Sequence, residues 1–247
     1  MSSTDPELVS QTDPPMESPL HGFQGDRGPV ARPQSGPRGL TIAVSREAGA
    51  RGGTIAQRVG KKIGWQVYHQ ELLDYIVQEG NVREGGMGQL LAGGEEWIEG
   101  RLRQLTAARQ LSPAVLAQAR LILALALDGQ VVLLGRGAGC LLPRETTLHV
   151  RIIAPLDDRI AYMSQWLRMT KDEAAGQVRL RDTRRAEFIQ NHFHRQPADV
   201  YQYDLLLNSS FLGEEACVDL IVQAAKAKQA ARAETTGEPR WRAEAVE

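Results

Sequence analysis

The chain has 247 residues, a formal net charge of -1 and 42% hydrophobic residues, enough apolar material for one large domain or two small ones. The near-neutral charge argues against a protein that binds duplex nucleic acid. Few aromatic residues among many aliphatic ones favour an α/β protein over a β-sandwich.

Cysteine content and hydropathy predict the compartment. Cys140 and Cys217 are too few for a disulfide scaffold and lack the spacing of metal ligands, so we interpret them as buried thiols in a reducing cytoplasm. The sequence has no basic-then-apolar leader, and its longest apolar run, Leu121–Leu127, is too short to cross a membrane. We expect a cytoplasmic protein with no membrane or nucleic-acid partner, and homo-oligomerisation stays open.

Residues 1–38 hold seven prolines among polar and small residues, which predicts a disordered extension before a domain that opens at Gly39 or Leu40. The run Leu40–Val44 is typical of a strand buried on both faces. Arg46–Gly53 follows as a loop rich in glycine, and a helix is predicted from Thr54 because Ile55, Val59 and Ile63 share one face.

A strand, a glycine loop and a helix N-terminus together form an anion site, because unpaired N–H groups and the helix dipole converge there. The standard phosphate loop is G-x-x-x-x-G-K-[ST]. Aligning Thr54 with the threonine that closes a G-K-G-T version of this loop puts Gly52 at the lysine position, with Arg51 beside it and Arg46 at the loop entrance. On these residues alone, a degenerate phosphate loop and a plain tight turn are equally open.

Strands and helices alternate along the rest of the chain, which indicates βαβ units and a parallel sheet. The predicted strands are 65–68, 131–134, 148–153 and 204–207, and the predicted helices are 70–78, 95–110, 113–127, 156–169, 171–192 and 214–227. Residues 80–94 are expected to be a mobile connection and 228–247 a frayed polar tail.

Four residues stand just past predicted strand ends and should share the ligand-binding rim of the sheet: Arg46, His69, Arg136 and Pro155. Arg136 lies in a second glycine-rich turn, 135–139. A histidine at a strand end is more often structural than a ligand, so His69 is open to both interpretations.

The segment after Thr170 begins with an N-cap signature and is strongly cationic. Arg181 and Arg185 are four apart and face the same way, and Asp182 can pair with either Arg179 or Arg185. A solvated charged face is one interpretation. Opposite a phosphate loop the same arginines suit phosphate contact, because the guanidinium is planar and binds oxyanions through two N–H groups.

Six segments in order resemble the cytidylate kinase-like family, a branch of the P-loop nucleoside monophosphate kinases: SREAGARGG, GWQVYHQELL, VVLLGRGAG, LHVRIIAPLDDRI, RLRDTRRAEF and YDLLLNSS. The resemblance covers residues 40–226. It implies a P-loop NTPase domain over 39–227, with a five-stranded parallel sheet flanked by helices, a helical monophosphate-binding region at 80–128 and a lid at 170–200.

The implied activity is transfer of the γ-phosphoryl group of ATP, with Mg²⁺, to a nucleoside monophosphate such as CMP or dCMP, so the expected partners are nucleotides. Carried over by position, the residues fall into four sets. They are the catalytic Arg51, Arg181 and Arg185; the ATP-binding Arg46, Gly49, Ala50, Gly52, Gly53 and Thr54; the substrate-binding His69, Arg136 and Asp182; and Thr54 as the metal ligand.

Two positions depart from cytidylate kinases proper, which keep a loop lysine and an aspartate in a GRD turn. Here these positions are Gly52 and Gly137. An arginine must supply the missing charge or the rate must be low, since charge neutralisation is much of phosphoryl-transfer catalysis. A catalytically impaired regulatory protein that binds nucleotides therefore remains an alternative, as does a kinase for a non-nucleotide alcohol or sugar.

Overall fold

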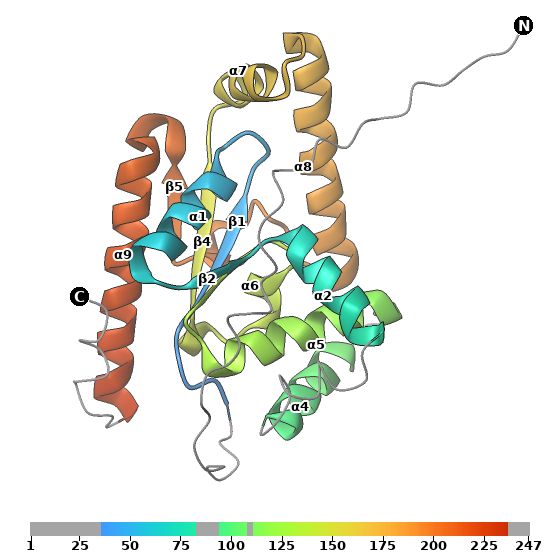
Figure 1. Cartoon of the computed structure of the whole chain (residues 1–247), viewed down its shortest axis with the longest axis vertical. Helices are drawn as coiled ribbons and strands as arrows, with labels where there is room; N and C mark the ends of the chain where they lie inside the picture. The colour runs from blue at the N-terminus through green and yellow to red at the C-terminus, as the bar shows by residue number, and fades with distance from the viewer. Residues whose placement is uncertain (1–35, 83–93, 108–110, 237–247) are drawn as a thin grey trace, which may run out of the picture. The chain divides into compact units, whose positions relative to one another are not determined.

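The computed structural model describes residues 36–82, 94–107 and 111–236, which form a five-stranded sheet covered by helices (Figure 1). Every strand pair is parallel and the order is β2-β3-β1-β4-β5. The strands are β1 (Thr41–Arg46), β2 (Gln66–Tyr68), β3 (Val131–Leu134), β4 (Thr147–Ile153) and β5 (Leu205–Asn208). The predicted α/β fold with a five-stranded parallel sheet is confirmed.

Helices connect the strands. They are α1 (Gly52–Ile63), α2 (Gln70–Val82), α4 (Glu95–Thr106), α5 (Pro113–Asp128), α6 (Ala138–Leu141), α7 (Leu156–Leu167), α8 (Lys171–Phe193) and α9 (Ser209–Thr236), with 3-10 turns η2 (Arg144–Thr146) and η3 (Val200–Gln202).

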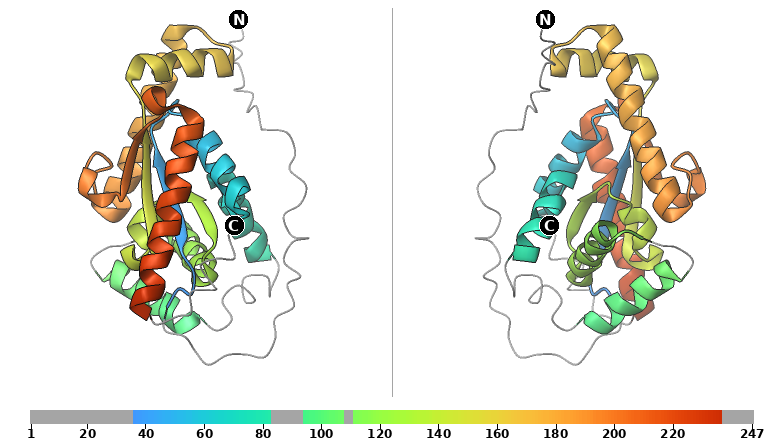
Figure 2. Two further views of the ribbon diagram at one scale, coloured as in Figure 1. Left: turned by 90° about the vertical axis from the view of Figure 1, so that its left-hand side faces the viewer. Right: turned by 90° about the vertical axis from the view of Figure 1, so that its right-hand side faces the viewer.

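Alternating residues of β1 belong to two hydrophobic cores, one on each face of the sheet, because successive side chains of a strand point to opposite faces. Ile42 and Val44 belong to a core that also contains buried residues of α1 and α9. Ala43 belongs to the other, which contains the apolar run Leu121–Ala126 of α5. Figure 2 shows α1 and α9 running side by side along the sheet. This two-faced burial explains why the strands carry almost no charge.

Helix ends follow the signals in the sequence. The hydroxyl of Ser112 accepts from the Val115 N–H at 3.4 Å with Pro113 in the first turn of α5, and Gly64 ends α1 with a φ of 71°. Thr170 and Glu173 form a complete capping box at the start of α8. These predicted boundaries are confirmed.

Other boundaries differ from the predictions. The helix predicted to end at residue 227 continues to Thr236, so the predicted frayed tail was wrong for 228–236. The reason is Lys228, whose ammonium donates to Thr147 O at 2.7 Å and to Asp204 Oδ2 at 2.8 Å and so holds this part of α9 on the sheet. Likewise α2 runs to Val82, into the predicted connection.

Several predictions lie partly or wholly outside the described residues, namely those for 1–35, 83–93 and 237–247. Near the first described residue, 36, the Arg38 N–H donates to Leu127 O at 2.7 Å. Cys217 is buried and Cys140 is half-buried, and within the described residues no helix is long and apolar enough to span a membrane.

Candidate functional site

The carboxyl ends of the central strands meet at one edge, as the sequence predicts. In the register of the sheet Arg46 lies opposite Ile152, and Val44 lies opposite Leu134, just before the turn that carries Arg136. Tyr68, the residue before His69, lies opposite Leu133. The sheet therefore brings Arg46, His69 and Arg136 to the same rim, and Pro155 caps α7 two residues after β4.

The loop between β1 and α1 is fixed by hydrogen bonds from α8 and α9 and by a close approach to α7. Asp182 Oδ1 accepts from the Ala48 N–H at 2.7 Å, and the Ser209 hydroxyl donates to Ala50 O at 2.8 Å. Gly49 has a φ of 81°, and a Cβ there would lie 2.6 Å from Arg159 O, so only glycine fits so close to α7. The loop is held in one conformation.

Helix α1 begins without a side-chain cap. Its N-cap, Arg51, has a left-handed φ of 57° and supplies no capping hydrogen bond. The first-turn N–H groups of Gly52, Gly53 and Thr54 have no partner within the helix, as in any α-helix. Because the helix dipole adds positive potential at this end, the turn can accept an oxyanion.

The side chain of Arg46 runs across the rim from this helix to the turn after β3. A Cβ added to Gly52 would lie 2.5 Å from Arg46 Cβ, and one added to Gly135 would lie 2.5 Å from Arg46 Nη1. Both glycines therefore make room for one arginine, whose guanidinium comes to lie beside the second glycine turn.

Three arginines from different elements form a cationic cluster, Arg46, Arg136 and Arg185. Burial lowers the pKa of Arg46 to about 10, with further lowering by Arg185 and Arg136. Burial likewise lowers the pKa of Arg185. Arg185 Nη1 and Arg136 Nε are buried without a hydrogen-bond partner, although Arg185 Nη1 lies 3.6 Å from Asp182 Oδ1. Such crowding of like charges is costly and is relieved by an anion.

Two acidic residues of α2 accompany the cluster, and sequence reasoning missed both. Asp74 Oδ2 accepts from Arg136 Nη2 at 2.5 Å, and Glu71 Oε2 lies 2.9 Å from His69 Nδ1. The hydrogen bond from His69 is the main reason that the pKa of Glu71 falls to about 2, and Arg46 contributes to the fall. Their spacing of three on the helix that follows β2 was the available signal, since it puts both carboxylates on one face.

Asp182 has a different main partner from those predicted. Its Oδ2 accepts from Arg159 Nη1 at 2.5 Å, and no pairing with Arg179 is seen among the described residues. Arg159 is buried and also donates to Ala154 O and Ala48 O. Asp182 therefore joins α8 to the loop between β1 and α1.

The remaining predicted residues are divided between the rim and its margin. Arg181 is close enough to Arg185 to lower its pKa, so the two do share a face of α8. Thr54 is exposed in the first turn of α1. Arg51 is set apart from the cluster, since its guanidinium lies 5.0 Å from the ring centroid of Tyr162 and its Nε 3.8 Å from Glu214 Oε1.

The arrangement fits a polyphosphate better than a dedicated metal cage. Uncapped N–H groups and unpartnered guanidinium nitrogens are donors for phosphate oxygens. No group of three or more potential metal-ligating side chains occurs among the described residues. Mg²⁺ in nucleotide sites needs few protein ligands, because phosphates and water complete its octahedron.

Comparison with known proteins assigns the family. The model of the cytidylate kinase-like family matches residues 41–211, which include the loop, the rim and α8. The chain belongs to the cytidylate kinase-like family. Membership supports a kinase-like function that uses nucleotides, without specifying the acceptor.

A curated relative matches a smaller part of this chain than the family model does. A uronate isomerase of Corynebacterium glutamicum is 34% identical over 96 residues, which are 39% of this chain and 18% of that protein. This chain thus spans less than a fifth of that relative.

Among solved structures, an uncharacterized protein from Eubacterium ventriosum ATCC 27560 superposes with a TM-score of 0.63 at 17% identity, over 77% of this chain and 99% of the other. A shikimate kinase from Bacteroides thetaiotaomicron gives a TM-score of 0.43 at 15% identity, over 75% and 97%. At such identities the first likeness concerns the fold alone.

The two departures from the cytidylate kinase pattern have steric reasons in this member of the family. A lysine at position 52 would collide with Arg46 at its Cβ, so Arg46 as placed here excludes it. Gly137 has a φ of 70°, and a Cβ there would collide with the ring of Phe193 from α8. The glycines at both positions therefore belong with Arg46 and Phe193.

Proposed function

We propose that the protein transfers the γ-phosphoryl group of ATP, with Mg²⁺, to a nucleoside monophosphate such as CMP or dCMP. The observation that carries the proposal is the position of Arg46, which occupies the space next to Gly52 and carries a positive charge from the loop to the rim. Arg46, and not Arg51, replaces the missing lysine.

The donor phosphates would bind at the first turn of α1, where the N–H groups of Gly52, Gly53 and Thr54 provide donors. Arg185, with Arg181 next to it, supports this end from α8. Phosphoryl transfer requires mainly positioning and neutralisation of the equatorial oxygens, so a cluster of fixed guanidinium groups suits the reaction. The Thr54 hydroxyl would hold Mg²⁺, which would neutralise charge on the phosphates.

The acceptor phosphate would bind at Arg136, on the other side of Arg46. Asp74 holds one nitrogen of Arg136 and leaves Nε unpartnered. His69 contributes indirectly, because it fixes Glu71 next to Arg46. Arg46 would thus lie between donor and acceptor, where negative charge develops as the phosphoryl group moves.

A coupled assay of ADP formation with ATP, Mg²⁺ and a panel of nucleoside monophosphates tests this function. We expect turnover with a pyrimidine monophosphate, and loss of at least about a hundredfold in Arg185→Ala. Arg184→Ala is the matched control, because Arg184 is exposed on the same helix. Turnover that survives unchanged in Arg185→Ala would contradict the proposal. If alcohols and sugars are added to the panel, turnover with these alone would indicate a kinase for a non-nucleotide acceptor.

The second candidate is a regulatory protein that binds nucleotides without turnover. Gly52 and Gly137 favour it, because the lysine and aspartate of cytidylate kinases are absent. Calorimetry separates the two candidates. Binding of ATP with Mg²⁺ and of a monophosphate without any ADP formation would establish the regulatory function.

A further inference from the structure

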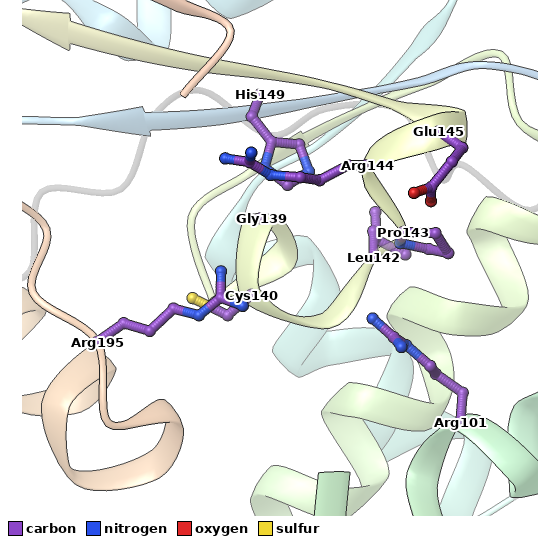
Figure 3. A pocket seen from close by; sticks show the side chains of 9 residues that line it. All are labelled: Arg101, Gly139, Cys140, Leu142, Pro143, Arg144, Glu145, His149 and Arg195. Carbon is purple, nitrogen blue, oxygen red and sulfur yellow. The ribbon is translucent and has the colours of Figure 1, made fainter. Parts of the chain in front are cut away.

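A hollow lies between α4, α6, η2, β4 and the chain that follows α8 (Figure 3). Its volume is about 240 Å³, and its lining includes Arg101, Arg144, Arg195 and His149. An adjoining hollow of about 440 Å³ shares Arg144 and Arg195 with it. None of the three arginines of the rim cluster lines either one.

The lining of this hollow carries more positive than negative charge. Three arginines and one carboxylate, Glu145, line it. Among the described residues none of these arginines forms an ion pair, and their acceptors are uncharged. Arg144 donates to Tyr201 O at 2.5 Å, and Arg101 Nε donates to Leu141 O at 3.1 Å. Carbonyl groups therefore orient these guanidinium groups without neutralising them.

His149 provides a second, independent indication of a ligand. The residue is 3% exposed, and its Nε2 is buried without a hydrogen-bond partner. Its Nδ1 lies 3.3 Å from Gln202 O, and because a carbonyl can only accept, Nδ1 carries the proton and Nε2 of the neutral ring is an acceptor. Figure 3 shows the head group of Arg144 beside this ring.

The groups around His149 keep it neutral. Burial is the main cause of its lowered pKa, and Lys228 and Arg144 lower it further, whereas Asp204 and the Gln202 carbonyl raise it. A buried acceptor beneath exposed cations selects for a ligand that combines negative oxygens with a hydroxyl donor.

We propose that this hollow binds a phosphate group, with two oxygens on Arg144 and Arg195 and a protonated oxygen donating to His149 Nε2. Inorganic phosphate meets these requirements because near neutral pH both of its ions carry charged oxygens and a P–OH group, and a phosphomonoester meets them as its monoanion. The source is either inorganic phosphate or a phosphomonoester. The organic part of an ester would extend into the adjoining hollow, where Tyr201 is 86% exposed.

Titration of the full-length protein with inorganic phosphate and with ribose 5-phosphate, followed by calorimetry and by NMR of the histidine ring nitrogens, tests the proposal. We expect a Kd of about 1 mM or tighter and a shift of His149 Nε2 on saturation. Tighter binding of the ester would identify the adjoining hollow as part of the site, and equal binding would limit the site to phosphate.

Variants separate this site from the rim. Arg195→Gln should weaken phosphate binding at this site, followed through the shift of His149 Nε2, about tenfold, and Arg144→Gln with Arg195→Gln should abolish that shift, with unchanged thermal unfolding. Arg103→Gln, exposed on the same helix as Arg101, should bind like the wild type. Arg185→Gln should also retain binding, whatever becomes of kinase activity. Binding that is absent, unaffected by the double variant or lost only in Arg185→Gln would overturn the proposal.

Discussion

A guanidinium whose pKa falls to about 10 has lost much of its hydration without gaining a full counter-charge. In Arg46 this cost arises next to Arg136 and Arg185, so the free protein maintains repulsion at its rim. Binding sites commonly hold such stress, because preorganised charges act on a ligand without first having to be assembled.

Replacing Arg46 by a neutral side chain of similar length should therefore separate stability from binding. We expect Arg46→Met to unfold at an equal or higher denaturant concentration while its affinity for ATP with Mg²⁺ falls at least about tenfold. Denaturation and calorimetry measure the two. Arg58→Met, exposed on α1, is the control. A variant that is less stable but binds ATP normally would contradict this account of Arg46.

The exclusion between Arg46 and a lysine at position 52 gives a double-mutant prediction. Gly52→Lys alone should destabilise the protein by about 1–3 kcal/mol and abolish activity, because the new Cβ meets Arg46 Cβ. Arg46→Gly removes that atom, so the double variant should be more stable than the sum of the single changes indicates. Strict additivity of the unfolding free energies would show that the two positions do not compete.

Glu71 should make stability depend on acid. Its pKa is about 2 in the folded protein against 4.5 as the reference value, so its stabilising contribution is complete above about pH 4.5 and disappears as the pH falls towards 2. The side chain is 79% exposed, so we expect at most about 1 kcal/mol. Urea unfolding of wild type and Glu71→Gln should differ at pH 5 and converge only below about pH 2. A constant difference would exclude this origin.

At the scale of elements, the carboxylate of Asp182 links α8 to the loop between β1 and α1. Asp182 accepts from the Ala48 N–H and from Arg159, whose side chain is 10% exposed. Removing it leaves the Ala48 N–H without its partner and takes one of two neighbouring carboxylates from Arg159, the other being Glu47.

We expect Asp182→Ala to lower the free energy of unfolding by about 2 kcal/mol, less than for a fully buried pair because Asp182 is 31% exposed. Asp182→Asn should recover part of this loss, since its oxygen still accepts from Ala48. Glu187→Ala, exposed on the same helix, is the control for chemical denaturation. If Asn and Ala variants are equally unstable, the contact with Ala48 contributes nothing.

The whole molecule depends on its last helix more than the sequence indicates. Because Lys228 of α9 bonds Thr147 O at the start of β4 and Asp204 just before β5, a chain ending at residue 227 loses a tie between two strands. We expect that truncation to unfold at a lower denaturant concentration than one ending at Thr236. Lys228→Met in the full chain should reproduce part of the difference. Equal midpoints for the two truncations would show that the contact is dispensable.

Local patterns predicted the sheet and the rim because they are encoded by neighbours in the sequence. Each of three features predicts its element from a few neighbouring residues: the apolar run at 131–134, the proline after Ser112 and the glycine loop after β1. Contacts across the chain were not predictable in this way. Nothing near Asp74 indicates that it meets Arg136, and nothing near Asp182 indicates Arg159.

The surroundings of Gly52 illustrate the same limit. The place of Arg51 beside Gly52 suggested a cation for the loop, but the left-handed backbone of Arg51 accompanies a side chain that contacts Tyr162 and Glu214. Arg46, several residues earlier, comes to Gly52 because β1 and α1 fold back on each other.

The strand order also bears on synthesis. β1 lies at the centre of the sheet, yet both of its neighbours, β3 and β4, follow α5 in the chain. On the ribosome, β1 therefore has no neighbouring strand to pair with until β3 has been translated, which is more than half of the chain. Nascent chains released before β3 would present this unpaired strand to chaperones and to one another.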